Sequence, residues 1–451
     1  MNATETICAL ATAPGGALGI IRVSGPKTFS AVSSICSVDC GSVSANTIHF
    51  TRIFDGPELV DEVMVSVFKS PHSYTGEDCV EISCHGSRYI LSKVLEMLVQ
   101  NGCRMANPGE YTQRAYLNGK MDLSQAEAVA DLIASSNRAT HQVAISQLRG
   151  LFSSKLAQLR EQLLKLTSLL ELELDFSDHE DLEFADRSEL LELAEIIYAH
   201  IRELASTFKQ GQAMKQGIPV AIVGKTNVGK STLLNKLVGD DRAIISDIHG
   251  TTRDTIEDLM EIDSILFRFI DTAGIRETTD EVERIGIERT MKAIEKARIV
   301  IWLFDTKPSA EEIDEMIHVT KGKRILQVLN KCDLYDMEHF HPFIVPMICI
   351  SAKRGNGIDT LKRRLIEEAR IDGLIGNESD VIITSARHHD ALLRAQQSIL
   401  RVIDGLQQNL SGDLLSEDLR QTLDILAEIT GGQITPQETL NNIFKHFCVG
   451  K

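Results

Sequence analysis

A single segment, from Gly224 to Ser231, constrains the fold of this chain more than any other. It reads Gly-Lys-Thr-Asn-Val-Gly-Lys-Ser, follows the compact apolar run Pro219 to Val223 and precedes a run with helical spacing. This is the GxxxxGK[ST] pattern of a phosphate-binding loop between a strand and a helix. Its glycines let backbone N–H groups face phosphates, its lysine adds positive charge and its serine offers a hydroxyl to Mg²⁺. The segment therefore predicts an α/β domain that binds a nucleotide.

Further motifs at the ends of predicted strands indicate that the nucleotide is GTP. Asp271–Gly274 (Asp-Thr-Ala-Gly) can supply a carboxylate to the Mg²⁺ shell and an N–H group to the γ-phosphate. Asn330–Asp333 (Asn-Lys-Cys-Asp) ends in a carboxylate that can accept two hydrogen bonds from guanine, which adenine does not offer. Ser351–Lys353 (Ser-Ala-Lys) can close over the base. The order and spacing resemble those of translation-factor-class GTPases and favour GTP over ATP.

The residue that orients the attacking water is not the usual one. Small Ras-like GTPases place a Gln directly after the glycine of this second motif, and Ile275 stands there instead. The residues alone leave two alternatives open. Internal arginine fingers are one, and acidic side chains that position water are the other. The candidates are Arg253 and Arg276 for the first, and Glu277, Glu281 and Glu283 for the second.

The nucleotide motifs lie in the middle of a multidomain chain of mixed α/β and α class. Strands alternate with helices between about 217 and 375, which predicts a parallel sheet covered on both faces. Before it come an α+β block and a helical stretch, and helical spacing returns at the end of the chain. The expected domains are 1–118 (α+β), 119–215 (first helical segment), 216–378 (inserted Ras-like P-loop G domain) and 379–451 (second helical segment).

Local patterns predict individual elements of these blocks. Short β-rich runs predict strands at 20–23, 63–67 and 79–82, and a helix from 89 to 100. Apolar residues spaced three or four apart from Ile145 to Leu170 predict one long helix, and a second helical stretch runs from Ser188 to Lys209. The strands expected in the G domain are 219–223, 266–270, 299–304, 325–329 and 346–350.

Composition limits the classes of partner. With 43% hydrophobic and 25% charged residues the chain has the balance of a globular protein. Its net charge of -17 disfavours a nucleic-acid footprint over the whole surface. No apolar run is long enough to span a membrane, no secretory leader is visible, and the nine cysteines show no paired CxxC spacing. We therefore expect a cytoplasmic protein with reduced thiols and no membrane partner.

Several longer segments resemble one family over essentially the whole chain, the tRNA-modification GTPase MnmE (TrmE) family. The segments that carry the resemblance are 108–123 (PGEYTQRAYLNGKMDL), 250–254 (GTTRD), 280–286 (DEVERIG) and 447–451 (FCVGK). The tail of this family usually reads Cys-Ile-Gly-Lys, so Val449 is a small departure, and Gly119 is another.

The resemblance implies the nucleotide site and its ions. Mg²⁺ is held by Ser231 and Thr252, and K⁺ by Asn227, Ser246, Ile248 and Thr251, where the cation takes the place of an arginine finger. The catalytic residue of the family, which orients water, falls on Glu283. The implied nucleotide-binding residues are Asn227, Val228, Gly229, Lys230, Ser231, Thr232, Ser246, Asp247, Ile248, His249, Gly250, Thr251, Thr252, Asp271, Thr272, Ala273, Gly274, Asn330, Lys331, Asp333, Ser351, Ala352 and Lys353.

The resemblance also implies a second ligand and several partners. The N-terminal block of this family forms a homodimer and binds 5-formyl- or methylene-tetrahydrofolate, at positions that match Arg22, Glu81, Lys120 and Lys451. The family acts in a heterotetramer-type complex with the FAD-dependent protein MnmG (GidA). Together they add an aminomethyl-type group to carbon 5 of the wobble uridine of certain tRNAs.

The C-terminal tail contains one further candidate. The match to the family assigns Cys448 a role in the modification step, either as a nucleophile or as a thiol that orders the folate site. The alternative function for the whole chain is a ribosome-assembly GTPase that binds rRNA. That function would need a basic RNA-binding module, and the helical tail is not basic in that way.

Overall fold

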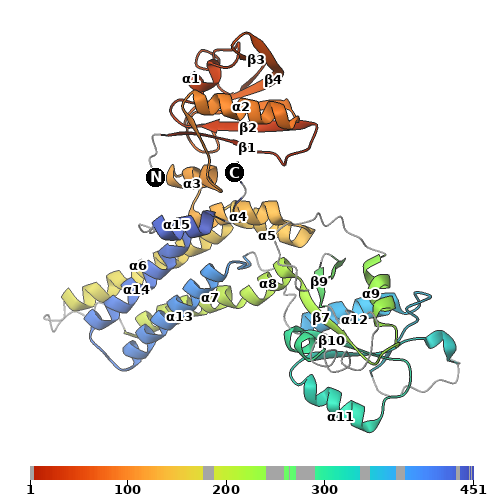
Figure 1. Cartoon of the computed structure of the whole chain (residues 1–451). Helices are drawn as coiled ribbons and strands as arrows, with labels where there is room; N and C mark the ends of the chain where they lie inside the picture. The colour runs from red at the N-terminus through yellow and green to blue at the C-terminus, as the bar shows by residue number, and fades with distance from the viewer. Residues whose placement is uncertain are drawn as a thin grey trace. The chain divides into compact units, whose positions relative to one another are not determined.

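The computed structural model describes residues 5–175, 187–239, 258–263, 265–270, 290–335, 346–371, 381–432, 437–445, 447, 449 and 450. By its internal contacts the chain divides into two compact units. The first comprises Met1–Ile133, Gln147–Leu164 and Arg420–Lys451, and the second comprises Ala134–Ser146 and Lys165–Leu419. Each unit contains one six-stranded sheet, and Figure 1 shows the elements of both.

The sheet of the first unit has the strand order β3-β4-β5-β2-β1-β6. Neighbouring strands run antiparallel, except that β1 and β6 are parallel. The strands predicted at 20–23, 63–67 and 79–82 are confirmed within β2, β4 and β5. The bounds are β1 Thr6–Leu10, β2 Leu18–Ser24, β3 Thr47–Asp55, β4 Glu58–Phe68, β5 Cys79–His85 and β6 Cys103–Met105.

The two faces of this sheet are covered differently. On one face, α1 (Thr28–Ser33) and α2 (Arg88–Gln100) enclose a core that includes Val94, Leu98 and Ile82. On the other face, Tyr111 of α3 (Glu110–Leu117) packs against Ile7 and Ala9 of β1. The helix predicted at 89–100 is thus confirmed, and the second face is where charged side chains meet the sheet.

The C-terminal segment folds with this first unit. In α4 (Leu123–Ala134), Leu123 and Ala126 pack against Leu440 and Phe444 of α15 (Gln437–Phe444). Apolar residues that are far apart in the chain therefore share one cluster, which places α15 beside α4 in this unit.

The long helix predicted from Ile145 to Leu170 is wrong in one respect. The structure has two helices there, α5 (Arg138–Leu148) and α6 (Leu151–Asp175). Gly150 stands between them with φ +81°, a left-handed conformation that interrupts a right-handed helix. The apolar spacing continues across the break because α6 buries Phe152, Leu156, Leu159 and Leu163.

The sheet of the second unit has the strand order β12-β11-β10-β7-β9-β8. It is parallel except at one edge, where β8 pairs antiparallel with β9. The five strands predicted in the G domain are confirmed, whereas β8 was not predicted. The bounds are β7 Ile218–Val223, β8 Asp258–Ile262, β9 Ile265–Ile270, β10 Ile299–Phe304, β11 Arg324–Leu329 and β12 Ile348–Cys349.

Helices cover both faces of this sheet, as the near-continuous apolar strands predict. Alternate residues of β7 face opposite sides: Val220 and Ile222 pack with α9 (Lys230–Gly239) and α12 (Ile358–Ile371), and Ala221 and Val223 pack on the side of α11 (Ala310–Val319). This is the doubly covered α/β fold expected for a Ras-like P-loop domain.

The helical part of the second unit pairs segments from before and after the sheet. Helix α7 (Arg187–Ser206) lies beside α13 (Ala386–Gln407), as Figure 1 shows. The predicted stretch 188–209 is instead two helices, because α8 (Phe208–Gln216) begins after Thr207. The Thr207 hydroxyl donates to Leu204 O and accepts from Ile383 N, so it links the junction of the two helices to the segment before α13.

Helix α14 (Gly412–Thr430) confirms the last predicted helical run. Within the described ranges, every helix is too short or too polar to cross a membrane.

Candidate functional site

The phosphate-loop motif forms the turn between β7 and α9. Asn227 has φ +63°, which Asn tolerates better than most residues, and Gly229 has φ +99°. The three following residues, Lys230, Ser231 and Thr232, form the first turn of α9. Because N–H groups in the first turn of a helix have no partner within that helix, they can bind an anion.

The lysine of the motif folds over its own loop. Lys230 Nζ donates to the carbonyl oxygens of Gly224 and Lys225, each at 2.7 Å. Burial lowers the pKa of Lys230 from its usual value. An anion beside Nζ would offset that shift, because a negative charge favours the ammonium form. The loop therefore combines a cation and unpaired N–H groups, as phosphate binding requires.

One buried side chain joins the separate nucleotide motifs. Asn330 Nδ2 donates to Val228 O at 2.7 Å, and Ala352 N donates to Asn330 Oδ1 at 3.0 Å. Asn330 is 3% exposed, so both bonds are shielded from water. The phosphate loop and the Ser-Ala-Lys segment are thus held at a fixed spacing by one amide.

The residues predicted to contact the base lie together at the ends of β11 and β12. Asp333 lies in the short 3₁₀ turn Cys332–Leu334, and Ser351 is fully buried. A hydrogen bond from Ser351 holds the pKa of Asp333 below its usual value. Arg354 Nε is 3.2 Å from Asp333 Oδ2. Asp333 is therefore a carboxylate at neutral pH, in the form that accepts hydrogen bonds.

Lys331, two residues before Asp333, connects this motif to the phosphate loop. Its Nζ donates to Asn227 O at 3.0 Å and to Asp305 Oδ2 at 2.6 Å. Asp305 directly follows β10 and was not predicted as a site residue. It has no recognisable motif around it, and only the sheet topology places it there.

Other predicted residues lie outside the described ranges. They are Ser246, Asp247, Ile248, His249, Gly250, Thr251, Thr252, Arg253, Asp271, Thr272, Ala273, Gly274, Ile275, Arg276, Glu277, Glu281, Glu283, Cys448 and Lys451. Lys353, which is described, is exposed beside Ala352.

A second group of candidate residues lies on the less covered face of the first sheet. Arg22 on β2 pairs in register with Glu81 on β5, and its Nε and Nη2 lie 2.9 and 2.7 Å from Glu81 Oε1. The Arg22 guanidinium also lies 5.5 Å from the ring centre of Tyr74 and 5.6 Å from that of Tyr111. Two aromatic rings at these distances favour a cation there. The two tyrosines were missed, because no sequence signal links them to Arg22.

The loop that carries Tyr74 also meets Lys120. Lys120 Nζ donates to Pro71 O at 2.9 Å, and Asn118 Nδ2 donates to Thr75 O at 2.7 Å. The structure thus brings Arg22 and Glu81 into direct contact. Lys120 is connected to them through the loop 71–77.

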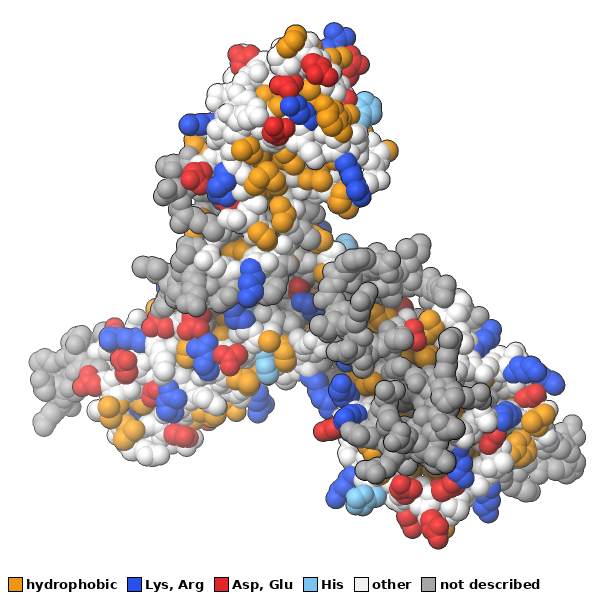
Figure 2. Space-filling model, viewed as in Figure 1, with side chains coloured by type: hydrophobic (Ala, Val, Ile, Leu, Met, Phe, Trp, Pro, Cys, Tyr) orange, Lys and Arg blue, Asp and Glu red, His pale blue; other side chains and the backbone are white. Residues whose placement is uncertain are grey.

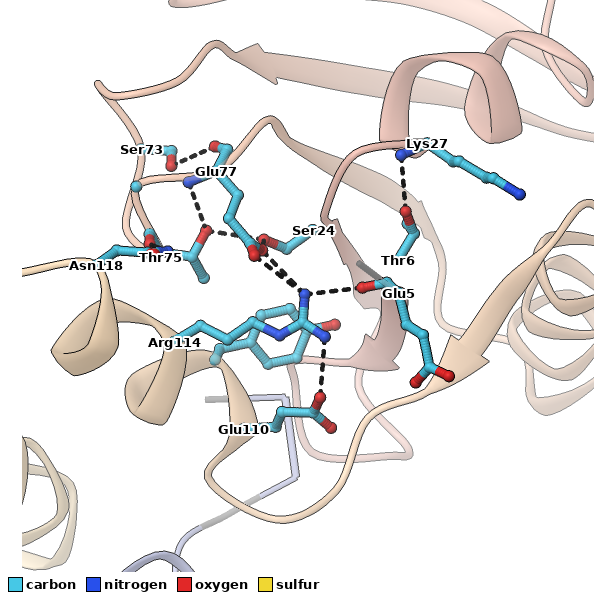
Figure 3. A network of polar contacts seen from close by, with 12 residues as sticks. Glu5, Thr6, Ser24, Lys27, Ser73, Thr75, Glu77, Glu110, Arg114 and Asn118 are labelled. Carbon is cyan, nitrogen blue, oxygen red and sulfur yellow. Dashed lines mark hydrogen bonds and ion pairs between the residues drawn. The ribbon is translucent and has the colours of Figure 1, made fainter. Parts of the chain in front are cut away.

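A buried ionic network holds the C-terminal end of this loop, at Glu77 (Figure 3). Arg114 on α3 donates to Glu77 Oε2 at 3.1 Å, to Glu110 Oε1 at 3.0 Å and to Glu5 O at 2.9 Å. Glu77 also accepts a bond from Ser24 at 2.7 Å. Because Ser24 ends β2, the network ties the loop to the strand that carries Arg22.

The charge of Glu110 is maintained although it is 2% exposed. Burial by itself would raise the pKa of Glu110, but hydrogen bonds from Arg104, Asn107 N and Arg114 outweigh burial and hold it below its usual value. Each buried charge of the network is therefore paired, as buried ions require.

The C-terminal tail reaches the same face. Arg22 Nη1 donates to Gly450 O at 3.2 Å, and Tyr116 Oη donates to Gly431 O at 3.1 Å. Phe447 packs with the cluster of Leu440 and Phe444. The neighbours of Cys448 and Lys451 are thus held against the N-terminal block.

The chain matches two family profiles and many full-length relatives. "GTP-binding protein TrmE N-terminus" matches residues 6–120, and "MnmE helical domain" matches residues 123–448. The protein is 51% identical over 466 residues to the tRNA modification GTPase MnmE of Bacteroides thetaiotaomicron, with 99% of each chain covered. It is 51% identical over 463 residues to that of Parabacteroides distasonis, with 99% of this chain and all of the relative covered.

Among solved structures, it is similar to Era of Aquifex aeolicus bound to GDP and AlF₄⁻. That match has 26% identity and a TM-score of 0.26, and it covers 40% of this chain and 66% of the other. The two profiles and the identity to the relatives over almost the full length show that the chain belongs to the MnmE (TrmE) family.

Proposed function

We propose that this protein hydrolyses GTP and acts in the modification of tRNA. The observation that carries the proposal is the arrangement around Asn330, which joins a phosphate loop to a base-binding end in a chain whose full-length relatives are named tRNA modification GTPases. In finer detail, we propose that it works with an FAD-dependent partner, MnmG. The pair installs an aminomethyl-type group at carbon 5 of the wobble uridine of certain tRNAs.

GTP binds with its phosphates over the first turn of α9 and its base against Asp333. The N–H groups of Gly229, Lys230 and Ser231 and the Lys230 ammonium group take the phosphate charge. The Asp333 carboxylate accepts from guanine N1–H and N2–H, and its low pKa keeps it ionised for that purpose. Adenine presents an acceptor at N1, so it is disfavoured.

The ions bind beside the phosphates. Mg²⁺ is held by the Ser231 hydroxyl, which is exposed at the start of α9, and by Thr252. K⁺ is held by Asn227, whose side chain is exposed, together with Ser246, Ile248 and Thr251. A monovalent cation there would offset negative charge in the transition state.

The proposed catalytic group is Glu283, which orients the attacking water because Ile275 has no polar atom to do so. Glu283→Ala should lose most of kcat with nucleotide affinity near that of the wild type. If Arg253→Ala or Arg276→Ala abolishes turnover and Glu283→Ala does not, an arginine finger is the catalytic group instead.

The N-terminal site binds a tetrahydrofolate that carries a one-carbon unit. Arg22 and Lys120 suit its carboxylates or ring carbonyl, Glu81 suits the pterin N–H groups, and Lys451 adds a further positive charge. Arg22 supports this assignment because its guanidinium is held by Glu81 and lies near the ring centres of Tyr74 (5.5 Å) and Tyr111 (5.6 Å). Cys448 takes part in the modification step, either as a nucleophile or by ordering this site.

The proposed assembly is a homodimer that joins MnmG and tRNA. On the second face of the first sheet, Ile48 is 63%, Phe50 66% and Met64 42% exposed. In register they lie on the same face as Glu81, and an apolar patch of this kind suits a second copy. Exposed apolar side chains are also visible in Figure 2.

The proposed domains are 1–118, 119–215, 216–378 and 379–451. We place the protein in the cytoplasm, where thiols stay reduced.

Two measurements test the proposal. Mass spectrometry of tRNA nucleosides from a deletion strain should show loss of the modified wobble uridine and its return with the wild-type gene. Steady-state GTP hydrolysis by the purified protein should be faster in potassium than in matched sodium salt. Unchanged wobble nucleosides in the deletion strain would contradict the role in tRNA modification, and equal rates in both salts would contradict the potassium site.

A further inference from the structure

The C-terminal tail is held by a close backbone contact at Gly450. This residue has φ +95°, and a Cβ atom added to it would lie 2.4 Å from Leu10 O and 2.8 Å from Ala11 Cα. Leu10 is the last residue of β1 and is held in register with Ile21 of β2, so its backbone can yield to an added side chain only by disturbing that pairing. Gly450 is buried, and its own carbonyl accepts from Arg22 Nη1 at 3.2 Å.

The preceding part of the tail uses a similar contact. A Cβ atom on Gly109, the residue before α3, would lie 2.8 Å from Phe444 O and 2.9 Å from Phe447 Cβ. The tail is therefore seated against the N-terminal block at two positions where only glycine fits. Both contacts lie beside the Arg22 site. Gly109 precedes α3, whose Tyr111 ring lies near Arg22, and Gly450 contacts β1, which pairs with the strand that carries Arg22.

We propose that Gly450 is a positioning residue for the N-terminal ligand site. It seats the tail on the end of β1 and, through its carbonyl, helps to hold the Arg22 guanidinium against Glu81. This inference rests on the proposed function of that site as a tetrahydrofolate site.

Arg22 links the tail to the ligand. Its Nε and Nη2 are bound to Glu81, and its Nη1 to Gly450. If the tail leaves, Arg22 Nη1 loses the Gly450 carbonyl as its acceptor. The guanidinium that the ligand meets is then held in place by Glu81 but no longer by the tail. If the seated tail holds Arg22 in the orientation that the ligand needs, seating favours binding, and by linkage binding favours seating by the same factor.

Gly450→Ala tests the proposal, and Gly102→Ala is its matched control. Gly102 has φ +90° in the same unit, but a Cβ atom there would have no atom within 4 Å. Both variants acquire an L side chain at positive φ, and only the first meets the end of β1. A difference between them therefore reports the local fit of Gly450 on the end of β1, its φ and its contact with Leu10 together, rather than a general effect of a strained alanine in this unit.

Carboxypeptidase B, which removes a C-terminal lysine, measures tail seating in the full-length protein. Release of Lys451 from Gly450→Ala should be at least about tenfold faster than from Gly102→Ala, because positive φ and the clash both favour the unseated tail. Affinity for 5-formyl-tetrahydrofolate should fall about tenfold, since seating and binding are coupled. GTP hydrolysis should match that of the wild type.

The outcomes separate the inference from the function on which it rests. Equal Lys451 release and equal folate affinity in both variants would overturn the role of Gly450. Faster release with unchanged folate affinity would also overturn it, because the tail would then be anchored without positioning the site. If the wild type itself binds no folate, the proposed ligand is wrong, whereas the release rates still test the anchor.

Discussion

The nucleotide site and the Arg22 site are built in different ways. In the first, neighbouring residues act mainly through the backbone, and the Lys230 ammonium group binds carbonyl oxygens of its own loop. In the second, charged side chains from separate strands bind one another, and Arg22 reaches a carbonyl 428 positions away in the chain. The first site depends on loop conformation, whereas the second depends on paired charges.

This difference predicts which kind of substitution damages each region. Removing a charge should harm the N-terminal block most, because a buried ion that loses its partner destabilises the fold. Adding a methyl group should harm the phosphate loop most, because its glycines adopt conformations and contacts that exclude a side chain.

The largest effect is expected from Arg114→Met in the N-terminal block. The variant leaves Glu77 and Glu110 without their shared partner, and Glu110 is 2% exposed. We expect a loss of roughly 3–5 kcal/mol of local stability. Native-state hydrogen exchange in β1 and β2 measures it, and exchange in β7 and β10 is the internal control. Unchanged protection in β1 and β2 would show that the network does not stabilise this block.

Gly229→Ala should have the next largest effect, on nucleotide affinity. A Cβ atom there would lie 2.4 Å from Asn330 Nδ2, and φ is +99°. Strain and loss of the buried Asn330 bond together predict an affinity for GDP lower by about 100-fold, or about 2.7 kcal/mol. Gly322→Ala, at φ +80° with no atom within 4 Å, is the matched control. Similar affinities in both variants, measured by calorimetry, would contradict the role given to Asn330.

Glu110→Gln should change the pH dependence of the N-terminal block. The folded-state pKa of Glu110 is held below its ordinary value of 4.5. Its charge therefore contributes stability above pH 4.5, and this contribution is lost as the pH falls through the folded-state pKa. Hydrogen exchange or chemical denaturation of the wild-type block between pH 6 and pH 3 should show this loss. The variant should be less stable at neutral pH and less sensitive to acid, and equal acid sensitivity would speak against the assignment.

The smallest effect is expected at an exposed ion pair of the same sheet. Arg52 and Glu62 lie 2.9 Å apart, with side chains 57% and 44% exposed. Solvent screens such pairs, so Arg52→Ala should change stability by less than about 1 kcal/mol. If Arg52→Ala lost as much stability as Arg114→Met, burial would not be what distinguishes the exposed ion pair from the buried network.

The two sites also differ in how far the sequence predicts them. The phosphate loop, Asn330 and Asp333 were found because each lies in a contiguous motif at the end of a strand. The roles of Tyr74, Glu77 and Asp305 were missed, because their partners are distant in the chain and only the folded structure brings them together. Antiparallel β8 and the helix breaks at Gly150 and Thr207 were also missed. At Gly150 the apolar periodicity continues through a break that the positive φ of one residue produces.

We propose that one chain has two separate ligand sites, one for a guanine nucleotide and one for a tetrahydrofolate. Calorimetric titration of two variants with GDP and 5-formyl-tetrahydrofolate tests it most directly. Asp333→Asn should lose GDP, gain xanthosine diphosphate and keep the folate, whereas Glu81→Ala should lose the folate and keep GDP. An Asp333→Asn variant that still prefers GDP, or a Glu81→Ala variant that binds the folate as the wild type does, would contradict the account.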